Sequence, residues 1–79
     1  MSEKVNTMEC YETKDTALAS YLLATEHQLL GIAGPKGQRV FRFAGVSDGD
    51  RLAYYQDAPV GARKLFESYR TLKGLLFAG

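Results

Sequence analysis

The sequence predicts an α+β fold: a small antiparallel sheet, made of a hairpin over residues 27–44 and a short N-terminal strand, packed by two or three helices. Two observations predict it. Strand-like runs flank a Gly-Pro-Lys-Gly turn, and segments before and after them carry apolar residues at helical spacing. A chain of 79 residues, 46% hydrophobic and 24% charged, has the composition of one folded domain. We expect that domain over residues 9–79, after a flexible N-terminus over residues 1–8.

The first two elements are predicted from alternation and capping. Apolar and polar residues alternate from Met8 to Glu12, which is typical of a short strand. A helix is expected to follow from about Asp15 to Thr25, with Thr13 as its cap and Asp15 favourably placed in the first turn. One face of this helix is expected to meet the core, since apolar or uncharged residues recur at offsets 0, 3, 4 and 7: Leu18, Tyr21, Leu22 and Thr25.

The glycine-rich segment in the middle of the chain predicts a turn. Pro35 sets the backbone angle for the first central position, and Gly37 can take the positive φ that a bulged hairpin requires. The expected strands are 27–33 and 38–44. A phosphate-binding loop would need a longer glycine spacing, and a dinucleotide fingerprint would need a helix behind it. A strand follows instead, so neither motif is present.

Alternation along the second hairpin strand puts Phe41 and Phe43 on one face, with Arg39, and Val40 and Arg42 on the other. The phenylalanine face is the expected core face. On the first hairpin strand, the same rule predicts one row with Leu30 and Ile32 and an opposite row with Leu29, Gly31 and Ala33.

Two further helices are predicted in the second half. Ser47 is the expected cap of a short helix to about Gln56, which would bury Leu52 and one or both of Tyr54 and Tyr55. The last helix is expected from Ala62 to about Phe77, with surface ion pairs of Glu67 to both Arg63 and Arg70. Its expected core face consists of Leu65, Phe66, Tyr69, Leu72 and Leu76.

Catalytic and metal-binding motifs are not recognisable in the sequence. Cys10 is the only cysteine and His27 the only histidine, so the chain offers neither an internal disulfide nor a metal site built from Cys and His ligands. A Cys10–His27 nucleophile pair would lack a third, orienting residue. We therefore expect a protein that is not an enzyme and has no cofactor and no metal.

The sequence carries no predicted membrane span and no predicted secretion signal. The longest uncharged stretch is far shorter than the roughly 20 apolar residues that cross a bilayer, and the N-terminus lacks the apolar core of a secretion signal. The expected location is the cytoplasm, without membrane contact.

Charge is distributed unevenly along the chain. Residues 1–26 carry two basic and five acidic side chains, a net charge of −3, whereas residues 27–79 carry eight basic and four acidic, a net charge of +4. Such a division can steer an anionic partner to one side of the protein. The candidate partner-binding residues are the cations of the hairpin and of the last helix: Lys36, Arg39, Arg42, Arg63, Arg70 and Lys73.

The chain resembles a family of small proteins of unassigned function found in phages, plasmids and other mobile elements. The resemblance covers roughly residues 10–76 and rests on core and capping positions, so it carries no functional residue over. Proteins of this size on mobile elements include anti-CRISPR inhibitors, which occupy a surface of a host nucleoprotein complex. The segments that carry the resemblance are Tyr11-Glu-Thr-Lys-Asp15, Leu18-Ala-Ser-Tyr-Leu-Leu23, Val40-Phe-Arg-Phe43, Tyr55 and Leu72-Lys73.

The resemblance implies a non-enzymatic binding protein in the cytoplasm of a bacterial host, which docks on and blocks a defence complex of the CRISPR-Cas type. Docking would use Arg39, Arg42 and the row of Arg63 and Arg70, where nucleic acid would otherwise bind. Two alternatives remain open. The cations with Phe41 or Phe43 could bind nucleic acid directly, or residues 75–77 could make the chain a dimerisation module, present as a monomer or weak homodimer.

Overall fold

The computed structural model describes residues 10–78, and within them the order strand, helix, strand, strand, helix, helix is confirmed. The antiparallel sheet and the α+β class are confirmed as well. The predicted flexible segment 1–8, which includes Met8 of the expected first strand, lies outside the described residues. The elements are β1 (Cys10–Thr13), α1 (Thr16–Ala24), β2 (Gln28–Ala33), β3 (Val40–Ala44), α2 (Asp48–Tyr55) and α3 (Ala62–Ala78).

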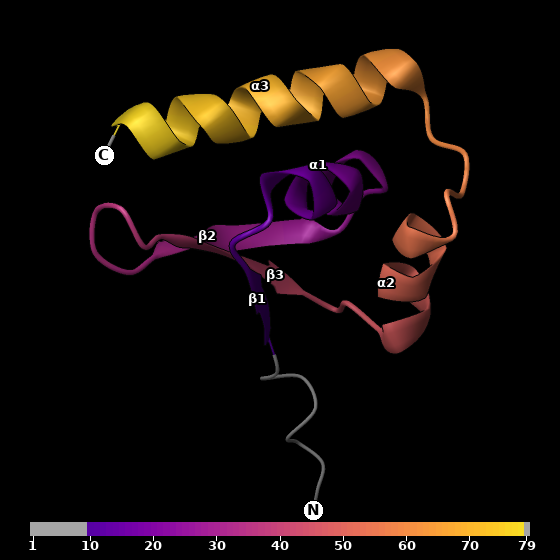
Figure 1. Ribbon diagram of the computed structural model, residues 1–79, viewed down its shortest axis with the longest axis horizontal. Coiled ribbons are helices and arrows are strands. Elements are labelled where there is room, and N and C mark those ends of the chain that lie inside the picture. Colours follow the sequence, from indigo (N-terminus) through magenta and orange to yellow (C-terminus); the bar gives the residue numbers. More distant parts are fainter. Residues whose placement is uncertain (1–9, 79) are drawn as a thin grey trace, which may run out of the picture.

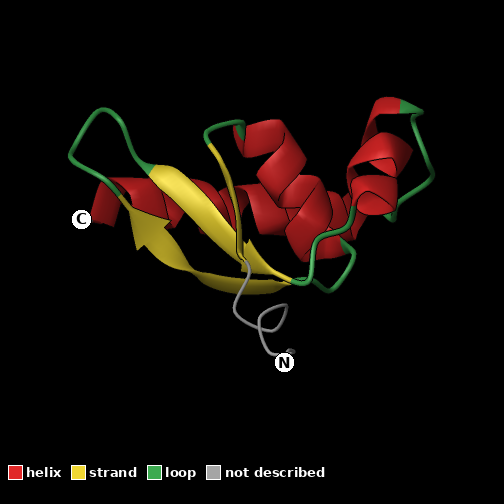
Figure 2. Ribbon diagram, turned by 90° about the horizontal axis from the view of Figure 1, so that it is seen from below, coloured by secondary structure: helices red, strands yellow, loops and turns green. Residues whose placement is uncertain are grey.

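The sheet has the strand order β1-β3-β2, with both pairs antiparallel (Figure 1). Phe41 and Phe43 of the central strand are buried against the helices, as the alternation predicts. Arg42, between them, therefore faces away from the helices. Figure 2 shows the helices lying to one side of the sheet, so its other face is not covered by any helix in residues 10–78.

Helix α1 lies between α3 and the strands (Figure 1) and is buried on nearly every side. The prediction of a single core face was therefore too narrow, because this helix is enclosed by elements on two sides. The hydroxyl of Ser20 is satisfied inside the helix, where it donates to the Thr16 carbonyl at 2.7 Å. The buried residues of α1 are Leu18, Ala19, Ser20, Tyr21, Leu22 and Ala24.

The cap of α1 is Asp15 and not Thr13. The Asp15 carboxylate accepts hydrogen bonds from the backbone N–H groups of Ala17 and Leu18, at 3.0 and 3.3 Å. Thr13 still belongs to the extended strand β1, too far back to reach these donors, and its hydroxyl accepts from the Asp15 N–H instead. Both side chains thus order the transition from strand to helix.

The predicted turn at residues 34–37 is confirmed. The Gln38 N–H donates to the Pro35 carbonyl at 2.9 Å, and Gly37 has the expected positive φ, +89°. Gly34 also has a positive φ, +96°, and a side chain there would come within 2.7 Å of the Gln38 carbonyl oxygen.

A bulge in β2 overturns the predicted rows of that strand. The pairing shifts between Leu29 and Gly31, so that Leu29 lies opposite Phe43 and Ile32 opposite Phe41. Both apolar residues therefore contribute to the core, whereas Leu30 is left half exposed. Gly31 has φ +153°, a backbone conformation that residues with a side chain rarely adopt. The extra residue of the bulge moves every later residue of β2 to the opposite face of the sheet from the one that simple alternation predicts.

Helix α2 begins as predicted at Ser47. The Ser47 hydroxyl accepts from the Asp50 N–H, and the Asp50 carboxylate accepts from the Ser47 N–H at 2.8 Å, which forms a capping box. The same carboxylate lies 3.0 Å from Nε2 of His27, which follows α1. Tyr54 packs against Tyr21, with ring centroids 5.5 Å apart. This orientation leaves Leu52 54% exposed, so its expected burial is wrong.

The buried stripe of α3 also differs from the predicted one. Leu72 is fully buried, Ser68 is buried, and Leu65 and Leu76 pack partly against the core. Phe66, expected in the core, is 65% exposed.

An ion pair joins α3 to the end of α1, beside the buried stripe of α3. Nζ of Lys64 lies 2.6 Å from Glu26 after the end of α1 and lowers the Glu26 pKa. Tyr69, also expected in the core, is one of the exposed large apolar residues. The contact with Glu26 holds the Lys64 side of α3 towards α1, while the side with Phe66 and Tyr69 is turned outwards.

Two glycines should respond in opposite ways to alanine. Gly31→Ala should lower the free energy of unfolding by about 1–2 kcal/mol, because its positive φ is strained for any side chain. Gly74→Ala, inside α3 with open space around the new Cβ, should raise it by about 0.5–1 kcal/mol. Urea unfolding followed by circular dichroism measures both; equal effects of one sign would contradict the bulge.

Asp50→Ala should lower the free energy of unfolding by about 1 kcal/mol at pH 7, because it removes the capping box and the partner of His27. Hydrogen bonds from the Ser47 backbone and from His27 lower the pKa of Asp50 below its ordinary 3.8. A lowered folded-state pKa stabilises the protein above the unfolded-state pKa, and this contribution is lost as pH falls through the folded-state value.

The difference between wild type and Asp50→Ala in urea unfolding should therefore shrink when the pH is lowered from 7 to about 2.5. Asp48→Ala is the matched control, since Asp48 is also acidic and in the first turn but pairs with Arg51 and not with Ser47 or His27. A difference for Asp50→Ala that stays constant with pH would show that its carboxylate charge does not matter.

Candidate functional site

The six cations predicted to bind a partner do not form one surface. Arg42 lies on the sheet face away from the helices and already has partners there. Its Nε is 3.0 Å from Glu12 Oε2, and its Nη2 is 3.1 Å from Cys10 Sγ. Contacts with Cys10 and Glu12 raise the Arg42 pKa. Arg42 therefore stabilises the pairing of β3 with β1, away from the cations of α3.

Three of the predicted cations are brought together by the hairpin turn and the end of α3. Lys36 and Arg39 line a hollow of about 300 Å³ with Leu76 and Phe77. Nζ of Lys73 lies 5.3 Å from the Phe77 ring centroid. Arg39 precedes β3 and lines this hollow with residues of α3, a helix on the side of the sheet that Phe41 and Phe43 face. It connects the turn to α3.

The remaining two, Arg63 and Arg70, lie on the exposed surface of α3. Arg63 is 4.0 Å from Glu67 Oε2, which confirms that predicted ion pair, although both side chains are largely exposed. Arg70 lies beside Glu67 in a shallow depression, but the predicted ion pair between them is not formed among residues 10–78. Exposed pairs of this kind contribute little to stability, so both arginines are available for a partner.

The exposed aromatic residues of α3 lie next to these arginines. We call Phe66, Tyr69, Lys73 and Phe77 the aromatic face of α3; they follow one another at offsets 0, 3, 7 and 11, along one side of the helix. Phe77 is 80% exposed. The Lys73 ammonium lies over both the Tyr69 and Phe77 rings, 5.8 and 5.3 Å from their centroids. This face continues from the hollow at one end to a groove at the other.

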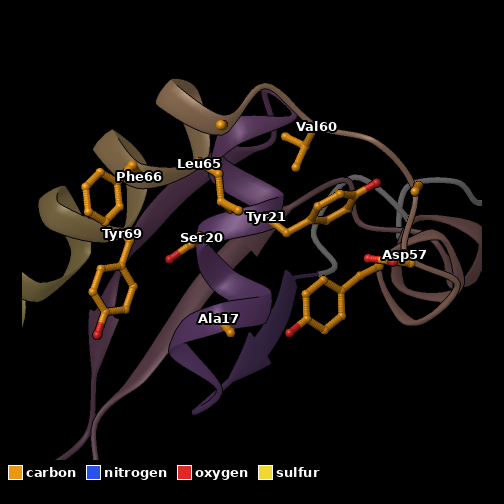
Figure 3. A pocket seen from close by; sticks show the side chains of 11 residues that line it. Ala17, Ser20, Tyr21, Asp57, Val60, Leu65, Phe66 and Tyr69 are labelled. Carbon is orange, nitrogen blue, oxygen red and sulfur yellow. The ribbon is translucent and has the colours of Figure 1, made fainter.

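The groove has a volume of about 400 Å³ and is formed by α1, the segment before α3, and α3 itself. Its floor is made of the small residues Ala17 and Ser20 of α1, and Phe66 and Tyr69 form one wall (Figure 3). The opposite side is lined by Tyr21, Val60 and Asp57. Tyr54, which packs against Tyr21, is a further aromatic residue of the lining. Small residues between large aromatic ones leave this space open.

Charged residues lie on both sides of the groove, at different distances from it. Arg63 and Arg70 lie beyond Phe66 on α3, outside the groove lining, and α3 carries four basic residues and one acidic residue. Asp57 lines the groove on the other side, and burial together with the charge of Asp15 raises the pKa of Tyr54 there. The groove is therefore apolar inside, with cations beyond its α3 wall and an acidic residue in its opposite wall.

No group of three or more His, Cys, Asp or Glu side chains that could hold a metal ion occurs in residues 10–78. No helix among these residues is both long enough and apolar enough to span a bilayer. His27 contacts Asp50, while Cys10 contacts Arg42, and no hydrogen bond joins Cys10 to His27 in the described part of the chain.

Comparisons with protein families, with curated proteins and with solved structures found no match for this chain.

Sequence reasoning missed the groove because it assigned Phe66 and Tyr69 to the core. No signal in the sequence separates them, because the five apolar residues expected on the core face all fall on one side of α3 and periodicity does not show which of them a neighbour covers.

One substitution on the buried side of α3 and one on its exposed side test whether Phe66 lies outside the core. Leu72→Ala should lower the free energy of unfolding by about 2–5 kcal/mol, because it opens a cavity at a fully buried position. Phe66→Ser, at an exposed position, should change it by less than about 1 kcal/mol. Urea unfolding measures both, and a loss for Phe66→Ser as large as that for Leu72→Ala would place Phe66 in the core.

Proposed function

We propose that this chain is a non-enzymatic binding protein that docks on a protein partner through the groove and the aromatic face of α3. The observation that carries the proposal is the exposure of Phe66 on the wall of an apolar groove. Soluble proteins bury most large aromatic side chains, and exposed apolar patches with a polar border are typical of interaction sites.

The composition of this surface supports the same function. Tyrosine, phenylalanine and arginine are enriched at protein interfaces, and tyrosine and arginine supply much of the binding energy. Tyr69 and Phe66 lie beside Arg63 and Arg70 on α3. The sheet face is less suited to docking, because Arg42 is engaged with Glu12 and Cys10.

The partner that we propose is a nucleoprotein complex of a bacterial host's defence, of the CRISPR-Cas type, which the bound protein prevents from binding DNA. The resemblance to small proteins of mobile elements supports this choice. The cations next to the docking surface support it as well, because Lys73, Arg63 and Arg70 would lie close to a site that binds nucleic acid. The protein would then act in the cytoplasm of the host.

A second candidate function is direct binding of nucleic acid. The observation that favours it is the hollow beside Phe77, where Lys36, Arg39 and Lys73 could contact phosphates while the exposed ring stacks on a base. It ranks second because the hollow is lined by two cations, with Lys73 beside Phe77 as a third, and the groove carries Asp57.

Inhibition of DNA binding tests the proposed function. Purified guide-RNA-loaded effector complexes from several CRISPR types are mixed with the protein and with labelled target duplex, and DNA binding is measured by gel shift. We expect one complex to lose target binding. Phe66→Ser and Arg70→Glu should each weaken this inhibition about tenfold or more, since the first removes an aromatic ring of the docking surface and the second reverses a charge beside it.

Arg42→Glu is the matched control, because it makes the same charge change as Arg70→Glu on the other face. It should inhibit like the wild type, with its fold checked by circular dichroism because the new carboxylate lies opposite Glu12. Loss of inhibition in Arg42→Glu alone would move the docking surface to the sheet. If no complex is inhibited and the protein itself shifts the labelled DNA, direct nucleic-acid binding replaces the proposal.

A further inference from the structure

We infer that the groove receives an amphipathic helix of the partner, with apolar side chains in the groove and acidic side chains along the flank that faces Arg63 and Arg70. This inference rests on the proposed function and names the chemistry of the docking segment. Three properties of the site carry it: the shape of the groove, the distribution of charge around it, and the length of the aromatic face.

The shape of the groove fits the side chains of a helix. A floor of Ala17 and Ser20 between aromatic walls leaves about 400 Å³, within the usual range for apolar binding sites. Grooves of this kind take the apolar stripe of a helix, whose anchors recur at i, i+3 or i+4, and i+7. Phe66 and Tyr69 on one wall and Tyr21 on the other would contact both sides of that stripe (Figure 3).

The length of the aromatic face fits about three helical turns. From Phe66 to Phe77 the helix rises about 16 Å, at about 1.5 Å per residue. A partner helix aligned with α3 would therefore contact the groove near Phe66 and the Phe77 ring at the other end. Leu76 and Arg39 line the hollow beside Phe77, so an acidic side chain at that end of the partner would also meet a cation.

The charge of α3 favours an acidic partner over a second copy of this chain. Arg63, Arg70 and Lys73 of α3 lie on or beside the aromatic face with the single acid Glu67, whereas Lys64 pairs with Glu26. In a symmetric pair of α3 helices the arginines and Lys73 of the two copies would lie close together, and like charges at an interface cost binding energy. An acidic flank on the partner would neutralise the same residues.

The acidic residues on the opposite side of the groove favour a helix over a nucleic-acid strand as its occupant. Asp57 lines the groove, and Asp15 is close enough to Tyr54 to raise its pKa. A phosphate backbone in the groove would pass these carboxylates, whereas a helix can carry acidic residues on one flank and neutral or basic residues on the other. The apolar floor likewise suits aliphatic side chains better than phosphates.

Selection from a peptide library tests this inference. Displayed helical peptides of about 18 residues carry fixed Leu and Phe at one stripe, and the positions on each flank vary among Glu, Gln and Lys. Selection on the wild-type protein should enrich Glu on one flank. For a selected peptide, replacing those Glu residues by Lys should weaken binding about tenfold or more, measured by fluorescence anisotropy.

Charge reversal identifies the residues that select the charge on the flank of the bound peptide. The double variant Arg63→Glu, Arg70→Glu should enrich Lys on the flank where the wild type enriches Glu, while Arg42→Glu should select the same peptides as the wild type. Selection on Phe66→Ser should enrich no peptide, with the fold of the variant checked by circular dichroism. Peptides that bind Phe66→Ser as tightly as the wild type, or a Glu preference unchanged in the double variant, would overturn the inference.

The outcomes also separate the inference from the proposed function. If an effector complex is inhibited through Phe66 but selection gives no acidic flank, docking stands and the acidic helix is rejected. If acidic helices are selected but no effector complex is inhibited, the chemistry of the groove stands and the defence complex is rejected as partner. Tight binding of a labelled single strand of about 20 nucleotides, lost in the double variant, would assign the cations to nucleic acid and overturn the inference.

Discussion

The burial of α1 on both sides is the constraint on which the rest of the structure depends. This nine-residue helix buries six of its residues, so it is covered twice: by Phe41 and Phe43 of the sheet, and by α3 with Leu72. Two ion pairs accompany this arrangement. Glu26 after the end of α1 pairs with Lys64 of α3, and His27 pairs with Asp50 of the capping box of α2. With Leu72 in the core, Phe66 and Tyr69 on the other side of α3 stay exposed among residues 10–78.

Local patterns were sufficient to predict the order of elements, the turn at residues 34–37 and the start of α2 at Ser47, because each depends on neighbouring residues. The bulge at Leu29 and Gly31 was not predictable from alternation, because alternation assumes a regular pairing and does not show where one residue is left unpaired. Phe66 was misassigned for a different reason. Periodicity shows which residues of a helix share a side, but which part of a wide apolar side is covered depends on the neighbouring helix.

The candidate site shows the same limit. Sequence reasoning identified the cations, but their grouping depends on tertiary structure: the turn brings Lys36 and Arg39 to Phe77, while the pleat sends Arg42 to the other face. Burial of Leu72 turns one side of α3 towards the core. The aromatic face and its neighbouring arginines lie on the other side and are therefore exposed. Fold and proposed function are therefore linked, because the packing that buries α1 also exposes the residues proposed to bind the partner.

Solvent access to the four phenylalanine rings tests this link most directly. Phenylalanine is selectively ¹³C-labelled in its ring, and the resonances are recorded by NMR in dilute protein, with and without a soluble paramagnetic agent. The account predicts strong broadening of the Phe66 and Phe77 signals and none for Phe41 and Phe43. Protection of Phe66 would contradict it, because α3 would then have a different rotation or would already be covered, and the groove would not be open to a partner.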